Sequence, residues 1–148
     1  MTIINYENLK IKFSFFYISA ATNYRYLLAK VCSGEVLYPG NPINFKSVYF
    51  NEGMQYTNGV FLIFDPGYYQ VTIHLTPVNK ETDIGAEILI NNLNSHLYGQ
   101  GTNGGTLNIS SIVKLELYDS VNVKIRYGTT TRYSDANHFV IQKISSNY

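Results

Sequence analysis

The sequence predicts a single all-β domain, a two-sheet sandwich or jelly roll built from eight to ten short strands. The chain has 148 residues, which is the length of one ordinary domain. Its 14 Tyr and 8 Phe, together with many Val, Ile and Thr, favour strands over helices. Short apolar runs alternate with turn residues such as Asn58-Gly59 and Asp65-Pro66-Gly67, at the spacing typical of such folds.

The composition excludes several classes of protein. The 11 Lys and Arg balance the 10 Asp and Glu to a net charge of +1, so we expect neither a nucleic-acid partner nor an anionic membrane surface. The single cysteine, Cys32, excludes an intrachain disulfide and a Cys-based zinc site. Since no run of 18 apolar residues occurs, no membrane insertion is expected.

Residues 1–23 are expected to form an N-terminal extension ahead of a domain over residues 24–148. Ile11, Phe13 and Phe15 alternate with polar residues, which predicts an added strand. The run 13–18 also imitates a secretory signal, but it is short and is broken by Ser14. The added strand is therefore the favoured interpretation, and the signal is not convincing.

Two kinds of apolar pattern predict the strands along the chain. Strict alternation over 69–75, 113–117 and 121–126 predicts antiparallel strands with one face in the core and the other in water. Unbroken apolar runs at 27–29, 60–64 and 139–141 predict strands that are covered on both faces.

The doubly apolar runs predict a homo-oligomer. If these strands share a sheet, its outer face needs a cover, and an identical neighbour is the simplest one. The alternative is that the N-terminal twenty residues fold back over that face.

A series of segments, in order and with preserved spacing, resembles the globular domain of the C1q/TNF-like superfamily. The series consists of NPINFKSVYFN at 41–51, Tyr56, GVF at 59–61, PGYYQV at 66–71, LELYDSV at 115–121 and the closing strand FVIQKI at 139–144. The resemblance covers roughly residues 24–144. Tyr118 stands where the family usually has Gly, and the closing strand is more similar to the C-terminal domains of bacterial collagen-like exosporium glycoproteins.

The resemblance implies a ten-stranded jelly roll of two antiparallel sheets that assembles as a homotrimer. The sheet facing the three-fold axis would contain the strands at 27–29, 60–64, 106–117 and 139–144. The trimer interface expected on this basis is Leu27, Ala29, Val60, Leu62, Phe64, Ile112 and Val140. The expected core is Phe50, Phe61, Ile63, Tyr69, Val71, Ile73, Leu115, Val121, Val123 and Phe139.

A ligand surface is expected in the loops at the ends of the sandwich, because one sheet is committed to the axis. The other sheet would present a flat wet face made of Gln70, Thr72, His74, Asn122, Lys124 and Arg126. The loops combine aromatic anchors with flexible polar groups, a mixture that suits protein or carbohydrate recognition. The candidate ligand-binding residues are Tyr98, Arg132, Tyr133 and Asn137.

The sequence contains no recognisable catalytic constellation. His74, His96 and His138 are widely separated and match no metal spacing, and no nucleophile or phosphate-loop motif occurs. We therefore predict no catalytic residues, no metal ligands, no cofactor and no enzymatic activity. Glu81, Asp83, Asp119 and Asp135 could contribute to a calcium site, although solvated turn residues are the favoured interpretation.

The leading hypothesis is a non-enzymatic homotrimeric recognition or adhesion module, extracellular or on a particle surface. The alternative is a structural coat component or a trimer-nucleating head of a bacterial or phage surface protein. Exposed tyrosines outside the core would favour the first, and their absence would favour the second.

Overall fold

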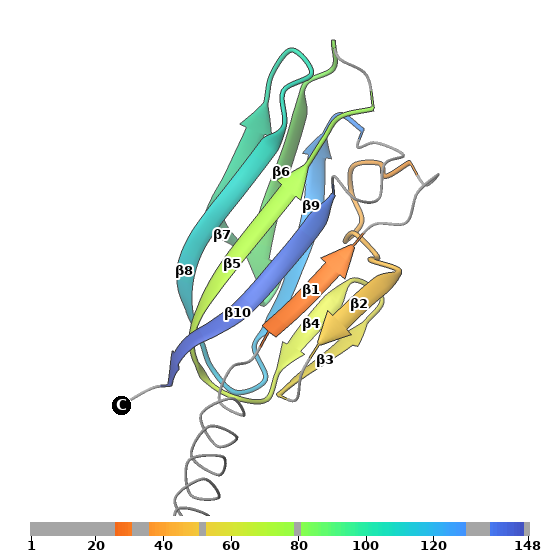
Figure 1. Ribbon diagram of the computed structural model, residues 1–148. Helices are drawn as coiled ribbons and strands as arrows, with labels where there is room; N and C mark the ends of the chain where they lie inside the picture. The colour runs from red at the N-terminus through yellow and green to blue at the C-terminus, as the bar shows by residue number, and fades with distance from the viewer. Residues whose placement is uncertain (1–25, 31–35, 51–52, 79–80, 130–136, 147–148) are drawn as a thin grey trace, which may run out of the picture.

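The computed structural model describes residues 26–30, 36–50, 53–78, 81–129 and 137–146. The regular elements in these ranges are ten strands: β1 (Tyr26–Lys30), β2 (Ser47–Phe50), β3 (Met54–Thr57), β4 (Val60–Ile63), β5 (Gly67–Leu75), β6 (Ile84–Ile90), β7 (Leu93–Gly101), β8 (Leu107–Leu115), β9 (Ser120–Tyr127) and β10 (His138–Ser146). The predicted all-β fold of two antiparallel sheets is confirmed (Figure 1). The expected extension over residues 1–23 lies outside the described residues.

The two sheets have five strands each and lie face to face. The first sheet has the order β2-β1-β10-β5-β8, and the second has the order β3-β4-β9-β6-β7. The last strand, β10, lies between β1 and β5, where Val140 is paired with Leu28 on one side and with Thr72 on the other (Figure 1). The two ends of the described chain therefore meet at the centre of the first sheet.

Turn residues close the two tight hairpins as the sequence predicts. Asn58 and Gly59 join β3 to β4 with φ of 48° and 86°, and Asn91 and Asn92 join β6 to β7 with φ of 54° and 58°. Positive φ at both central positions is the geometry of the type I′ hairpin turn, and Asn and Gly adopt it at least cost. Local sequence thus fixes where these hairpins turn.

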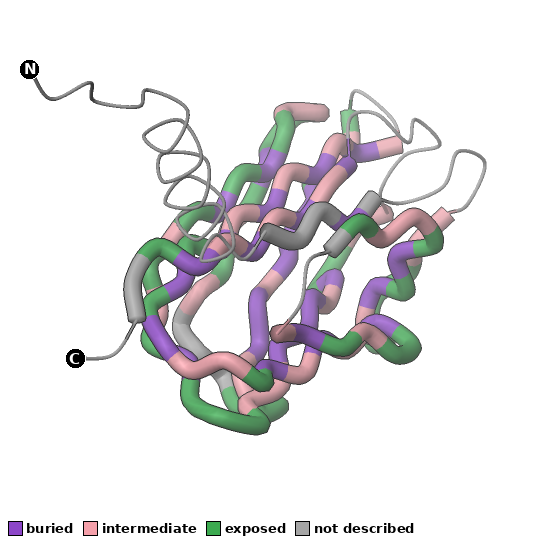
Figure 2. Tube along the Cα trace, turned by 60° about the horizontal axis from the view of Figure 1, so that its bottom comes forward, coloured by how far each residue is buried: buried purple, intermediate pink, exposed green. Residues whose placement is uncertain are grey.

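The core lies between the two sheets, whose strands alternate buried residues with more exposed ones (Figure 2). Aromatic rings lie at its centre. The ring of Phe61 lies 5.4 Å from Phe139, 6.3 Å from Phe45 and 4.6 Å from Tyr56 between centroids. Fully buried side chains include nine of the expected core residues: Phe61, Ile63, Tyr69, Val71, Ile73, Leu115, Val121, Val123 and Phe139. The side chain of Phe50, the tenth, is not among the described ones.

One expectation about the sheets is wrong. The strand at 60–64 was assigned to the same sheet as 27–29, 106–117 and 139–144, but β4 pairs with β3 and β9 in the second sheet. Its place in the first sheet is taken by β5, which pairs with β10 and β8. Apolar residues on both faces of a strand report its burial but not its neighbours, so the pattern could not distinguish the two sheets.

Candidate functional site

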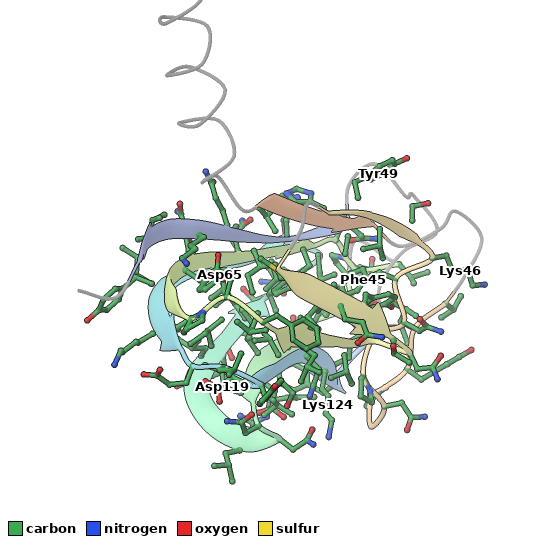
Figure 3. The ribbon with its side chains drawn as sticks, turned by 90° about the horizontal axis from the view of Figure 1, so that it is seen from below. Phe45, Lys46, Tyr49, Asp65, Asp119 and Lys124 are labelled. Carbon is green, nitrogen blue, oxygen red and sulfur yellow. The ribbon has the colours of Figure 1, made fainter. Side chains whose placement is uncertain are left out.

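The outer face of the first sheet is the first candidate surface, and we call it the β5–β8 face. Side chains that point away from the core alternate along its strands with buried ones. Its described members are Tyr49, Tyr68, Gln70, Thr72, His74, Asn108, Ser110, Ile112, Lys114, His138, Val140 and Gln142. In Figure 3, Tyr49 points away from the sandwich, whereas Phe45 lies between the sheets.

The β5–β8 face combines exposed apolar side chains with short uncharged ones. Ile112 in β8 is 62% exposed and Tyr49 in β2 is also 62% exposed, while Thr72 and Ser110 share a hydrogen bond of 3.0 Å between them. Contiguous apolar side chains are typical of a surface that another molecule covers, and Val140, Leu28 and Tyr49 are consecutive cross-strand neighbours on this sheet. This face is therefore suited to protein contact.

Charge is scarce on the same face. Among its described members, Lys114 is the one side chain of the Lys, Arg, Asp and Glu types, and it lies 2.7 Å from the carboxylate of Glu116. The hydrogen bond from Lys114 to Glu116 and the attraction between the two raise the pKa of Lys114. The described members of the face therefore lose little solvation energy when they are covered.

Two histidines stack at one end of the β5–β8 face. The rings of His74 in β5 and His138 in β10 lie 5.1 Å apart and are nearly parallel, at 7°. The Nδ1 atom of His74 lies 2.6 Å from Oδ1 of Asn108 in β8, so the two atoms share a hydrogen bond. His74 was expected to be simply solvated, but its ring has defined partners on two neighbouring strands.

The expected trimer-interface residues do not all lie on one face. Ile112 and Val140 lie on the β5–β8 face, whereas Val60, Leu62 and Phe64 belong to the second sheet and the turn after it. The outer faces of the two sheets lie on opposite sides of the core, so they cannot both be turned toward one three-fold axis. The assignment of Val60, Leu62 and Phe64 to that face is therefore wrong, for the pairing reason given above.

Ala29 is also misplaced in the expected interface. It is fully buried in the core, where it is paired with Phe139 and Val48 across the sheet. In antiparallel sheets, paired residues share a face, and Phe139 is a core residue. The side chain of Leu27, the remaining interface candidate, is not among the described ones.

The expected ligand-binding residues are scattered. Tyr98 is 65% exposed, but it lies in β7 on the outer face of the second sheet rather than in a loop. Asn137 is fully buried, and its Oδ1 accepts a hydrogen bond of 2.7 Å from the backbone N–H of Thr76. Asn137 is thus a structural residue, which corrects its assignment to a ligand surface. Arg132 and Tyr133 lie outside the described residues.

The expected wet face is likewise divided between the sheets. Gln70, Thr72 and His74 lie in β5, and Asn122, Lys124 and Arg126 lie in β9. Asn122 is fully buried rather than wet, and its amide donates a hydrogen bond of 2.9 Å to Oδ1 of Asn92. The face of the second sheet is therefore defined by Lys124, Arg126 and their cross-strand neighbours.

The described carboxylates are used within the fold. Oδ1 of Asp83 accepts from the backbone N–H of Asn103, while Asp119 accepts from Asn91 Nδ2 and from the backbone N–H of Glu116. Within the described ranges, no three side chains of the His, Cys, Asp and Glu types gather as a metal site. Glu81 is exposed, and Asp135 lies outside those ranges.

The sequence interpretation named Tyr98 as a ligand-binding candidate but missed the side chains of strands β6, β7 and β9 that the structure groups with it. Arg126 lies 5.9 Å over the ring of Tyr98, and the hydroxyl of Tyr127 donates to Gln100 Oε1 at 3.0 Å. These residues lie far apart in the chain and only strand pairing brings them together. The surplus of exposed tyrosines was the one signal available in the sequence.

Comparisons with known proteins agree with this fold. No protein-family model and no curated protein sequence matches the chain. Its structure is similar to the crystal structure of murine APRIL at pH 8.0, with a TM-score of 0.66 and 10% identity over 82% of this chain and 100% of that chain. It is also similar to Eiger TNF from S. frugiperda, with a TM-score of 0.62 and 10% identity over 84% of this chain and 96% of that one.

The protein therefore has the jelly-roll fold of the TNF type, which confirms the predicted fold class. In the described part of the chain, no helix is long and apolar enough to span a membrane.

Proposed function

We propose that the protein is a non-enzymatic recognition or adhesion module that acts as a homotrimer, with the β5–β8 face turned toward the three-fold axis. The observation that carries the proposal is Ile112, an isoleucine that is 62% exposed in the middle of β8, between Ser110 and Lys114 on the same face. The resemblance to the C1q/TNF-like superfamily implies the same assembly, and the TNF-type fold supports it.

The chemistry of the β5–β8 face supports contact between copies of one chain. Identical surfaces that carry many like charges repel one another, whereas this face has a single described cation with its own carboxylate partner. Val140 and Ile112 supply apolar area, and Thr72, Ser110 and Gln70 supply hydrogen-bonding groups that tolerate burial when paired. The face therefore has the mixture found at protein interfaces.

Light scattering after size exclusion tests the assembly. We expect a mass of three times the 16.8 kDa of the chain at micromolar concentration. A monomer or a dimer under these conditions would contradict the proposal. The interface is expected to bury more than about 1,000 Å² per pair of protomers.

The ligand surface is proposed to lie away from the β5–β8 face, because assembly would cover that face. The proposed setting is extracellular or on a particle surface, and the resemblance of the closing strand favours a bacterial or phage source. A stable trimer that binds none of the protein or carbohydrate ligands offered to it would support the alternative role, a structural coat component or trimer-nucleating head.

A further inference from the structure

A β-bulge in β9 places two consecutive side chains on the same outer surface. The pairing of β6 with β9 shifts between Gly85 and Ala86, which are opposite Tyr127 and Ile125, respectively. Arg126 is therefore the extra residue, and both Arg126 and Tyr127 point away from the core while Ile125 is buried. Bulges commonly redirect side chains next to binding sites.

The ring of Tyr127 lies against the backbone of Gly85. A Cβ atom at residue 85 would lie 2.4–2.9 Å from three carbon atoms of this ring, so any larger residue at 85 would displace it. The hydroxyl of Tyr127 reaches across β6 to Gln100 in β7, at 3.0 Å from Oε1. The ring is thus held at both ends while the residue stays 42% exposed.

Charged groups lie on the same surface as this ring. Arg126 lies 5.9 Å over the ring of Tyr98, and its Nε is 3.9 Å from a carboxylate oxygen of Glu87. Glu87 is paired across the strands with Tyr98 and with Lys124, so one carboxylate stands between two cations. The surface therefore carries little net charge but many donors and acceptors.

We propose that this surface, formed by Gly85, Glu87, Tyr98, Gln100, Arg126 and Tyr127, binds a saccharide with a neutral pyranose ring stacked on Tyr127. We call it the β9 platform. The inference deepens the proposed function by naming a ligand class and a site, and it rests on the protein being a recognition module. The platform lies on the second sheet, opposite the β5–β8 face, so assembly through that face leaves it open (Figure 1).

The chemistry of the platform fits a saccharide better than other ligands. A pyranose offers a flat face of C–H groups to an immobile aromatic ring, and it offers hydroxyls that both donate and accept hydrogen bonds. Glu87 and Arg126 supply an acceptor and a planar set of donors beside the ring, and the Gln100 amide supplies further donors. A nucleic acid would need a strongly basic groove, which the compensated charges do not provide.

The proposal is tested on the full chain by saturation-transfer NMR and calorimetry. The ligands are four neutral hexasaccharides, one each of glucose, mannose, galactose and N-acetylglucosamine. We expect at least one to bind, with an affinity that changes less than about twofold between 50 and 500 mM salt, because stacking and hydroxyl contacts are not screened. Tyr127→Ala should lower the affinity at least about tenfold by removing the stacking surface.

Two further variants test the geometry. Gly85→Ala should lower the affinity to a similar extent, because the new methyl group displaces the ring. The matched control is Tyr118→Ala, which removes a 64% exposed tyrosine from the turn after β8 and should leave the affinity unchanged. Circular dichroism and light scattering on each variant establish that fold and mass are retained. If Tyr127→Ala does not fold, Gly85→Ala and Tyr127→Phe replace it. Gly85→Ala should lower the affinity, whereas Tyr127→Phe should retain most of it.

Three results would overturn the proposal. The first is that none of the four saccharides binds at millimolar concentration, and the second is binding that Tyr127→Ala and Gly85→Ala leave unchanged. The third is binding only to a uronic-acid hexasaccharide, offered as a charged comparison ligand, that 500 mM salt abolishes. The masses measured on the same samples separate this proposal from the assembly. A trimer without saccharide binding contradicts the platform alone, and a monomer that binds a saccharide contradicts the trimer alone.

Discussion

Phe61 holds the two sheets together at the centre of the aromatic core. Its ring is fully buried and contacts Phe139 from the first sheet and Tyr56 from the second. Phe64, three residues later, is 42% exposed and contacts Tyr118 edge to face at 5.9 Å. The same residue type therefore occupies a core position and a surface position within one segment.

Phe61→Ala should lower the free energy of unfolding by about 3–5 kcal/mol, because it removes buried apolar area and leaves a cavity. Phe64→Ala is the matched control and should cost about 1 kcal/mol or less, since its ring is partly in water. Urea denaturation of both variants measures the difference. Equal costs would show that the burial of the two rings has been assigned wrongly.

Lys143 and Asp65 form an ion pair at the edge of the core. The distance from Lys143 Nζ to Asp65 Oδ1 is 2.7 Å, with the lysine side chain 5% exposed and the aspartate 33% exposed. The hydroxyl of Tyr69 donates to the backbone carbonyl of Asp65 and so holds this turn in place. The pair thus joins β10 to the turn between β4 and β5.

Asp65→Asn should lower the free energy of unfolding by about 2–3 kcal/mol, because it leaves the buried ammonium of Lys143 without its carboxylate. The cost is below that of breaking a fully buried ion pair, because Asp65 is partly exposed to water. Lys143→Met removes the charge itself and keeps the aliphatic packing, so it should change stability by about 1 kcal/mol or less. Thermal denaturation at neutral pH measures both. A larger loss for Lys143→Met than for Asp65→Asn would contradict this account.

At the scale of elements, the proposed assembly surface includes β8 and no longer includes β4. Both have apolar side chains on their outer faces, Leu62 in β4 and Ile112 in β8. They belong to different sheets, and only the sheet of β8 also presents Val140. We therefore expect the proposed assembly to be more sensitive to a change at Ile112 than at Leu62.

Ile112→Glu should reduce the proposed trimer to monomers, because assembly would bury three additional carboxylates that repel one another. Leu62→Glu is the control on the opposite sheet and should leave the mass unchanged. Light scattering after size exclusion at micromolar concentration distinguishes the two variants. Dissociation caused by Leu62→Glu but not by Ile112→Glu would restore the original assignment of β4.

At the scale of the whole molecule, the last strand completes the first sheet. β10 pairs with β1 along one edge and with β5 along the other, so the first sheet cannot form in full without β10. Its Phe139 and Ile141 are fully buried between the sheets. Long-range pairing of this kind makes folding slow and cooperative.

Deletion of residues 138–148 should abolish cooperative unfolding, because β1 and β5 lose their shared partner and the core loses two large side chains. Deletion of residues 1–23 should leave the transition intact, since the proposed domain begins at residue 24. Circular dichroism during thermal denaturation measures both truncations. If the chain without residues 1–23 failed to fold, the proposed domain boundary would be wrong.

The sequence alone determined which side of most strands is buried. Alternation with a period of two depends only on local order along the chain, so Tyr69, Val71 and Ile73 could be placed in the core before the sheets were known. The turns at 58–59 and 91–92 were equally local, because Asn and Gly tolerate positive φ wherever they occur.

Only the tertiary structure decided which strands are neighbours. β4 and β5 differ in their apolar pattern, but the inner faces of both are buried. The sheet that each joins is set by pairing with strands distant in the chain: β4 pairs with β9, and β5 pairs with β8 and β10. The β9 platform depends on the same long-range pairing, because it needs a bulge in β9 opposite Gly85. Side-chain pattern reports the environment of a strand, whereas partner choice is a property of the whole folded chain.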